Sequence, residues 1–346
     1  MRRAAWNADA RLSLIEDSDL APGDQQVVVR VLSEGICGTD LHSYRGHLPP
    51  EAGRTPGHEM GGIVSAVGPG VDHVREGDTV GVEPLLRCGE CKLCTDGHYN
   101  QCQVAGGLIG LHVNGGMAQE VLAPASAVFR PPAGVDAEIT ALAEPLACAV
   151  HGFNQITVSQ GETVLVIGAG TIGLTAQLAA QAGGAATIVL ARHPHQQDAA
   201  RRLGATEVLG EDDASQQRLA ELAAEDSIDL VAECVGGQAD TIRQSIDVVR
   251  RLGRVLVLGL FAIESVPINP VNLMLHEVTV VGSVTYGAPG GRIADYQQAL
   301  DIVASYQEEA RSLITHRFTL DDVNAAFETA QDKGSKSIKV HLTPNG

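Results

Sequence analysis

The chain has 346 residues, of which 44% are hydrophobic and 19% are charged, and its formal net charge is −18. This composition is that of a compact folded protein rather than a disordered one. The excess of acid argues against binding to nucleic acid or to an anionic membrane surface, because phosphate recognition needs a basic face. A single hydrophobic core rarely grows beyond about 250–300 residues, so we expect two domains.

The N-terminus carries Arg2 and Arg3, but no apolar stretch follows them, so no secretory signal is predicted. No run approaches the roughly 18 apolar residues that a membrane span requires. Of the seven cysteines, four crowd into residues 88–102, which is a poor arrangement for disulfides and a good one for a metal. We therefore expect a cytoplasmic protein in a reducing compartment.

Short strands, separated by Gly and Pro, dominate the first 130 residues. Closely spaced strands of this kind are typical of an irregular β-barrel. The predicted strands include residues 27–32, 62–67 and 78–82.

The pattern changes near residue 137. A helix is predicted over 141–154, and short apolar runs then alternate with helical segments, the first of which is 171–181. Because these runs are continuously apolar, they should be buried on both faces, as in a doubly wound parallel sheet. The predicted strands are 163–167, 187–190, 228–232, 254–258 and 278–281.

A G-x-G-x-x-G motif follows the first of these strands and opens the first helix. Gly168 permits the tight turn, Gly170 lets the backbone approach a pyrophosphate, and Gly173 lets the helix pack closely on the strand. The helix N-terminus, at Thr171 and Ile172, offers unpaired N–H groups to phosphates. The motif predicts a dinucleotide-binding site.

The second strand ends in Arg192 rather than in the Asp or Glu that usually binds the ribose 2′-hydroxyl of NAD. An arginine there can pair with the 2′-phosphate of NADP. We therefore expect NADP as the preferred cofactor. The alternative is that Arg192 is a solvated surface residue and NAD binds.

The crowded cysteines have the spacing C-x₂-C-x₂-C-x₇-C in a polar loop. Four thiolates can close a tetrahedral shell around a structural zinc ion. An iron–sulfur cluster and four unligated thiols are the alternatives. The predicted ligands are Cys88, Cys91, Cys94 and Cys102.

A second group of reactive side chains is spread along the chain. The segment 35–42 supplies the thiol of Cys37, the hydroxyl of Thr39 and the imidazole of His42. His58 and Glu59 follow a Pro-Gly turn, and Glu144 precedes a proline in an apolar segment. Each of these side chains has an ordinary structural explanation, and sequence spacing alone does not show that they lie close together in the fold.

These motifs and their order resemble the zinc-dependent medium-chain alcohol dehydrogenase family, in particular its polyol, butanediol and threonine dehydrogenase branch. The resemblance implies an α/β fold that combines a chaperonin-10-like (GroES-like) irregular β-barrel catalytic domain with a Rossmann domain. The expected boundaries are 1–152 for the catalytic domain, 153–287 for the Rossmann domain and 288–346 for a return to the catalytic domain. A glutamate at position 144, where the classical branch has a third cysteine, favours the polyol branch.

By this resemblance Cys37 and His58 bind a catalytic zinc. Glu59 and Glu144 share the remaining protein-side role, one as a ligand and the other holding the zinc-bound water. The chain would then carry two zinc ions, one at each site.

The resemblance also implies a proton path from Thr39, through the cofactor ribose, to His42. Lys339 matches a basic position near the cofactor pyrophosphate. The expected reaction is hydride transfer between a secondary alcohol, such as a polyol or vicinal diol, and the nicotinamide cofactor. A homodimer or homotetramer is expected. The alternatives are a zinc-free reductase and a nucleotide-binding protein without turnover on the same fold.

Overall fold

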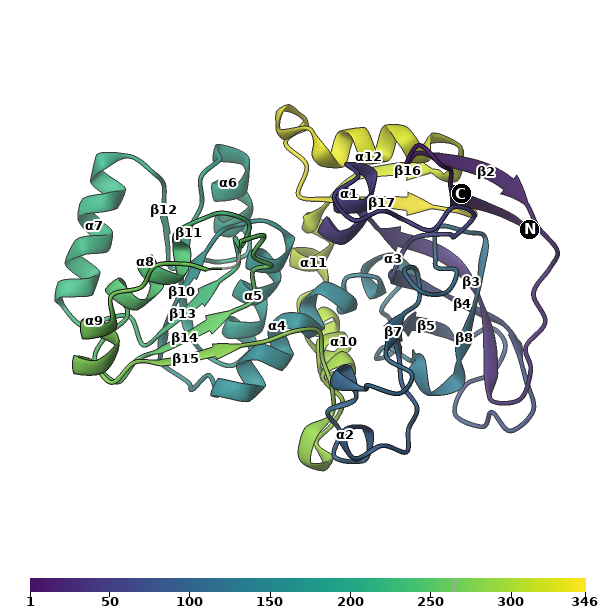
Figure 1. Cartoon of the computed structure of the whole chain (residues 1–346), viewed down its shortest axis with the longest axis horizontal. Helices are drawn as coiled ribbons and strands as arrows, with labels where there is room; N and C mark the ends of the chain where they lie inside the picture. The colour runs from purple at the N-terminus through teal and green to yellow at the C-terminus, as the bar shows by residue number, and fades with distance from the viewer. Residues whose placement is uncertain (264) are drawn as a thin grey trace. The chain divides into compact units, whose positions relative to one another are not determined.

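The computed structural model describes residues 1–263 and 265–346 of the chain (Figure 1). These residues form two compact units, one made of Met1–Glu144 with Gly287–Gly346 and the other of Pro145–Tyr286. The first change of unit falls in the first turn of α4 (Ala143–Ile156), the helix that also contains the expected boundary at 152/153. None of the helices in the described residues is long and apolar enough to cross a membrane.

The first unit is built on a seven-stranded sheet, in which the pairs are antiparallel except β16–β17. Its order is β16 (Ile314–Thr319), β17 (Lys339–Thr343), β3 (Gln26–Gly35), β4 (Glu59–Val67), β5 (Thr79–Val82) and β9 (Val128–Phe129), and β8 (Glu120–Pro124) also pairs with β3. Two small sheets join β1 (Arg2–Trp6) to β2 (Leu12–Glu16) and β6 (Leu85–Leu86) to β7 (Gly107–Leu108). Valines that alternate along β3 pack into the barrel core with Met60 and Val80.

The helices of this unit are α1 (Gly38–Tyr44), α2 (Lys92–Thr95), α3 (Ala137–Thr140), α10 (Asp295–Ser305), α11 (Gln307–Leu313) and α12 (Val323–Gln331). Short 3₁₀ turns accompany them at η1 (Tyr99–Gln101), η2 (Ala125–Ala127), η3 (Pro289–Gly291), η4 (Leu320–Asp322) and η5 (Lys333–Ser335). The rings of Trp6 and Tyr44 lie 5.8 and 4.9 Å from that of Phe327, so both ends of the chain share one core. The C-terminal segment therefore belongs to the first unit.

The end of β3 lies between two other strands. Gly35 pairs with Glu59 of β4 on one side and with His341 of β17 on the other. The turn that follows Gly35 carries Cys37. The sheet thus brings together segments from the start, the middle and the end of the first unit.

The second unit contains a parallel six-stranded sheet of order β12 (Glu207–Leu209), β11 (Ala186–Leu190), β10 (Thr163–Ile167), β13 (Leu230–Glu233), β14 (Arg254–Val257) and β15 (Thr279–Gly282). Its helices are α4, α5 (Thr171–Ala182), α6 (Pro194–Arg202), α7 (Asp213–Ala224), α8 (Thr241–Val248) and α9 (Pro270–Leu275), and they lie on both faces of the sheet (Figure 1). This doubly wound topology confirms the predicted fold class. The sequence did not indicate β12.

Candidate active site and zinc sites

The turn after β3 holds Cys37 as the residue that caps the N-terminus of α1. The backbone N–H of Cys37 donates to the carboxylate of Asp40 at 3.0 Å, and Asp40 is only 2% exposed. An acidic residue three positions into a helix is well placed to satisfy a free N–H at the helix start. The thiol of Cys37 is therefore held by its own local structure, and the Thr39 hydroxyl lies 3.9 Å from it.

His58 and Glu59 approach this thiol from β4. Gly57 makes the preceding turn with φ +101°, which is a conformation that glycine adopts without strain. The ligand atoms of Cys37, His58 and Glu59 lie within 4.8 Å of one another. Thiolate, imidazole and carboxylate are the donors that zinc takes in proteins, and this set therefore fits a zinc ion.

His58 is surrounded by acidic side chains. Burial by itself lowers the pKa of His58, but the facing Cys37 and Asp40 groups outweigh it and raise the pKa well above its ordinary value. The Nδ1 atom of His58 is buried, has no hydrogen-bond partner among the described residues, and lies 3.9 Å from the carboxylate of Asp40. A buried imidazole among anionic groups is an environment that favours a cation.

Glu59 has a second partner in Lys339, and both side chains are almost completely buried. The ammonium group of Lys339 also donates to the carbonyl of Ile36 at 3.0 Å. The structure thus places Lys339 beneath the Cys37 turn, where it forms an ion pair with a predicted zinc ligand. Glu144 is buried and acts electrostatically on His58, but it is not in the group of ligand atoms found within 4.8 Å among the described residues.

The four cysteines of the polar loop converge as the spacing predicts. Their sulfurs lie within 4.8 Å of one another, with Cys88 3.8 Å from Cys94 and 3.6 Å from Cys102. Backbone N–H groups that donate to sulfur lower the pKa of Cys88 and lower that of Cys102 to about 6, whereas burial raises the pKa of Cys94 to about 12. Four converging sulfurs fit a structural zinc ion.

The loop is attached to the barrel through Glu83, which is completely buried. The guanidinium of Arg87 lies 3.5 Å from this carboxylate and 4.0 Å from the centre of the Tyr99 ring. Burial raises the pKa of Glu83 to about 7, although Arg87 opposes the shift. Neither Glu83 nor Arg87 belongs to a sequence motif, so sequence reasoning missed this connection.

In the second unit, the glycine motif has the geometry that its residue types predict. Gly168 has φ +96° after β10, and a Cβ at Gly173 would overlap the carbonyl of Gly168. Gly170 caps α5, and the position of its missing Cβ is open. Thr171 and Ile172 form the first turn of α5, where N–H groups are available to an anion.

Arg192 follows β11 and is 68% exposed. Its Nε donates to Glu211 at 2.7 Å. This partner lies beyond β12, which pairs with β11, and it was not anticipated from the sequence. Arg192 is available to a ligand, but a carboxylate competes for it.

Two further buried carboxyl groups fix the backbone, one beside the candidate zinc ligands and one beside the glycine motif. Glu34 of β3 accepts a hydrogen bond from the backbone N–H of Glu59 at 3.0 Å. Glu233 of β13 accepts from the backbone N–H groups of Val235 and Gly236, and it thereby fixes the turn that packs beside Gly168. The available sequence signal was an acidic residue at the end of a strand, since Glu34 is the next-to-last residue of β3 and Glu233 is the last residue of β13.

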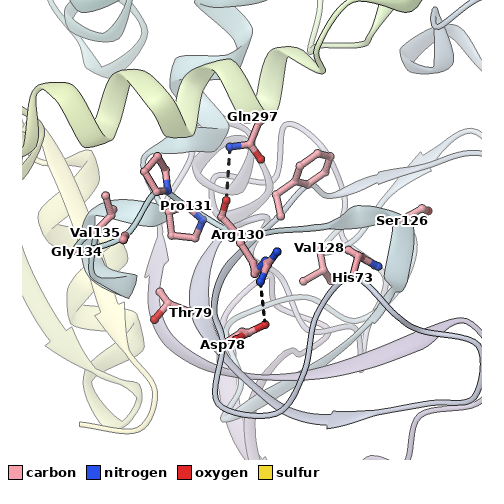
Figure 2. Close-up of a pocket in the computed structure, with 13 residues that line it drawn as sticks. His73, Asp78, Thr79, Ser126, Val128, Arg130, Pro131, Gly134, Val135 and Gln297 are labelled. Carbon is pink, nitrogen blue, oxygen red and sulfur yellow. Dashed lines mark hydrogen bonds and ion pairs between the residues drawn. The ribbon is translucent and has the colours of Figure 1, made fainter.

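A pocket of about 900 Å³ opens on the first unit beside β5 and β9 (Figure 2). Arg130 reaches toward Asp78 within it, at 3.8 Å, and Gln297 of α10 donates to the carbonyl of Arg130 at 3.5 Å. None of its lining residues is a predicted site residue. This cavity and the candidate zinc sites are separate features.

Comparison with known proteins agrees with this arrangement. Residues 23–133 match the alcohol dehydrogenase GroES-like domain, and residues 171–305 match the zinc-binding dehydrogenase domain. A sorbitol dehydrogenase of Halalkalibacterium halodurans is 33% identical, over 95% of this chain and 94% of its own length. A putative zinc-binding dehydrogenase of Sinorhizobium meliloti, solved with NADP, superposes with a TM-score of 0.88 at 30% identity, covering 99% of each chain. An Escherichia coli structure described as a short-chain alcohol dehydrogenase, solved with NADH, gives 0.87 at 27% identity, also over 99% of each chain.

The fold and the two cysteine-containing sites define a zinc-binding oxidoreductase with a GroES-like and a Rossmann domain. The chain belongs to the zinc-dependent medium-chain alcohol dehydrogenase family, in its polyol dehydrogenase branch.

The raised pKa of Glu83 predicts a pH-dependent stability. The folded state keeps the Glu83 proton up to about pH 7, whereas the unfolded chain loses it near pH 4.5, so the folded state loses stability as pH rises through this range. Between pH 6 and pH 8.5 the wild type should lose about 1 kcal/mol more free energy of unfolding than Glu83→Gln. Urea denaturation at both pH values measures this, and parallel pH dependences would contradict it.

Proposed function

We propose that this dehydrogenase oxidises a secondary alcohol of a polyol or vicinal diol reversibly to the ketone, with NADP as the preferred cofactor. The observation that carries the proposal is the convergence of Cys37, His58 and Glu59. In this assignment these residues would hold the catalytic zinc, Glu144 would hold a water molecule at that site, and the four-cysteine loop would hold the structural zinc. The similarity to a sorbitol dehydrogenase supports a polyhydroxylated substrate.

A zinc ion held by Cys37, His58 and Glu59 would supply Lewis-acid stabilisation of negative charge on the alcohol oxygen. Thr39, whose hydroxyl lies beside Cys37, accepts the alcohol proton in this mechanism. His42 follows Thr39 by three positions on α1, so the two side chains share one face of the helix. His42 is partly exposed and can release the proton to solvent.

Substitution Cys37→Ser tests the reaction and the site together. The zinc content should fall from two ions to one per chain, and kcat/KM for polyol oxidation should drop by about 10³-fold or more, because Lewis-acid stabilisation amounts to several kcal/mol. Metal analysis and assays of sorbitol and vicinal diols provide the measurements. Cys148→Ser, outside both cysteine clusters, is the control. Unchanged turnover in Cys37→Ser would refute the mechanism.

The cofactor preference rests on Arg192 and its competitor Glu211. Arg192→Ala should weaken NADP⁺ binding about tenfold and leave NAD⁺ binding unchanged, because only NADP⁺ carries the 2′-phosphate. Glu211→Gln should strengthen NADP⁺ binding, because it frees the guanidinium. Titration calorimetry with both cofactors measures this, and Arg201→Ala, an exposed arginine with its own ion pair, is the matched control. Equal losses for both cofactors in Arg192→Ala would contradict the assignment.

A second copy of this chain is the proposed partner of β15. This strand ends the six-stranded sheet, and in the part of the chain that the structure describes no strand pairs with its outer edge. It contains neither a charged residue nor proline, the features that usually protect an edge. On neighbouring α9, Val271, Met274 and Leu275 are more than half exposed. A twofold axis would pair each strand and its apolar flank with the same surface of the copy.

Val280→Lys on β15 should convert the oligomer to a smaller species, because an edge lysine opposes strand pairing. Sedimentation equilibrium gives the mass. Ile293→Lys, at an exposed position in the first unit, should leave the mass unchanged. A wild-type monomer, or an unchanged mass in Val280→Lys, would refute the interface. We also place the protein in the cytoplasm, and the absence of any disulfide bond among the described residues supports this proposal.

A further inference from the structure

Glu34 is a buried acid with no role in the mechanism above. It lies on β3 three residues before Cys37, and its side chain is completely buried. Oε1 accepts the N–H of Glu59, whereas Oε2 has no hydrogen-bond partner among the described residues. Burying a carboxyl group costs free energy unless its hydrogen bonds are replaced. Packing alone would favour a valine or leucine at this position of the strand.

The surrounding backbone makes room for this carboxyl group. A Cβ at Gly57 would lie 2.8 Å from Cδ of Glu34, and a Cβ at Gly116 would overlap Oε2. Two glycines from different segments therefore form the space that Glu34 fills. Such an enclosure restricts the carboxyl group to one position.

The hydrogen bond from the Glu59 N–H shows which part of the site the fixed Glu34 carboxyl group holds in place. Glu59 is the first residue of β4, and its N–H donates to a side chain rather than to a strand carbonyl. The peptide that carries this N–H joins His58 to Glu59. Fixing the peptide therefore fixes the directions of both side chains relative to Cys37. Glu34 itself is outside the group of ligand atoms found within 4.8 Å among the described residues.

We propose that Glu34 is a positioning residue for the catalytic zinc site, which acts by holding the His58–Glu59 peptide through the Oε1 acceptor. The inference rests on the proposed function in taking Cys37, His58 and Glu59 as zinc ligands. Groups that orient metal ligands in this way typically change metal affinity by about 10–100-fold when they are removed.

Three substitutions of Glu34 distinguish an effect of the position of its acceptor oxygen from an effect of its charge. Glu34→Gln keeps an acceptor oxygen at the same reach and removes the acid. Glu34→Asp keeps the acid, but its side chain is one methylene group shorter, so the carboxyl group lies farther from the Glu59 N–H. Glu34→Met keeps the approximate size and removes the acceptor. Glu16→Gln and Glu16→Met, at an exposed position on β2, are the matched controls.

The experiment equilibrates each intact zinc-loaded protein with graded dipicolinate and measures the zinc that it retains. We expect Glu34→Gln to hold both ions like the wild type. Glu34→Asp and Glu34→Met should lose one ion at about 10–100-fold lower chelator concentration. The zinc of the four-cysteine loop is an internal reference, because it should stay bound equally in every variant. Should Glu34→Met not fold, the contrast between Gln and Asp decides the question.

Each remaining outcome overturns the inference. Normal retention in Glu34→Asp with loss in Glu34→Gln would assign the effect to charge rather than to position. Equal retention in all variants, with a change only in the free energy of unfolding, would leave Glu34 a packing residue while the wild type still holds two ions. A wild type that holds only the four-cysteine zinc would refute the proposed function, and this inference would fall with it.

Discussion

The end of β3 is the constraint on which the candidate active site depends. Gly35 lies there between β4 and β17, and a side chain at this position would collide with Glu59 and Lys339. The missing side chain gives the buried ion pair its space, and the next residues turn to present Cys37. One strand end thus determines the separation of the thiol, the imidazole and the carboxylate.

This arrangement concentrates ionisable groups in a region that excludes water. Glu34, Asp40, His58, Glu59 and Lys339 are all nearly or completely buried. Charged groups are stable in such a place only when they are paired, hydrogen-bonded or bound to a metal. Lys339 supplies one positive charge to these buried acidic groups. A divalent cation at the ligand atoms would supply further positive charge. Metal binding at this site would therefore be coupled to folding, since the candidate ligand atoms converge only in the folded arrangement.

The sequence predicted the parts of the molecule that local pattern determines. Apolar runs located five strands of the parallel sheet to within about two residues, and the glycine and cysteine spacings specified two sites whose geometry is mostly local. The missing strand, β12, has three residues and begins with a glutamate, which hides the apolar pattern. The partners of Glu59 and Arg192 were inaccessible for another reason: Lys339 and Glu211 reach them through strand pairing, which sequence spacing does not reveal.

Strand pairing also makes the candidate site depend on the C-terminal segment. Lys339 begins β17, the last strand of the chain, whereas its partner Glu59 begins β4. Contacts between residues so far apart in sequence require loop closure, which costs conformational entropy. Until β17 docks beside β3, the Glu59 carboxylate lacks its buried cation, and its burial is unfavourable. The C-terminal segment, which returns to the first unit, therefore supplies the buried cation beside the candidate zinc ligands.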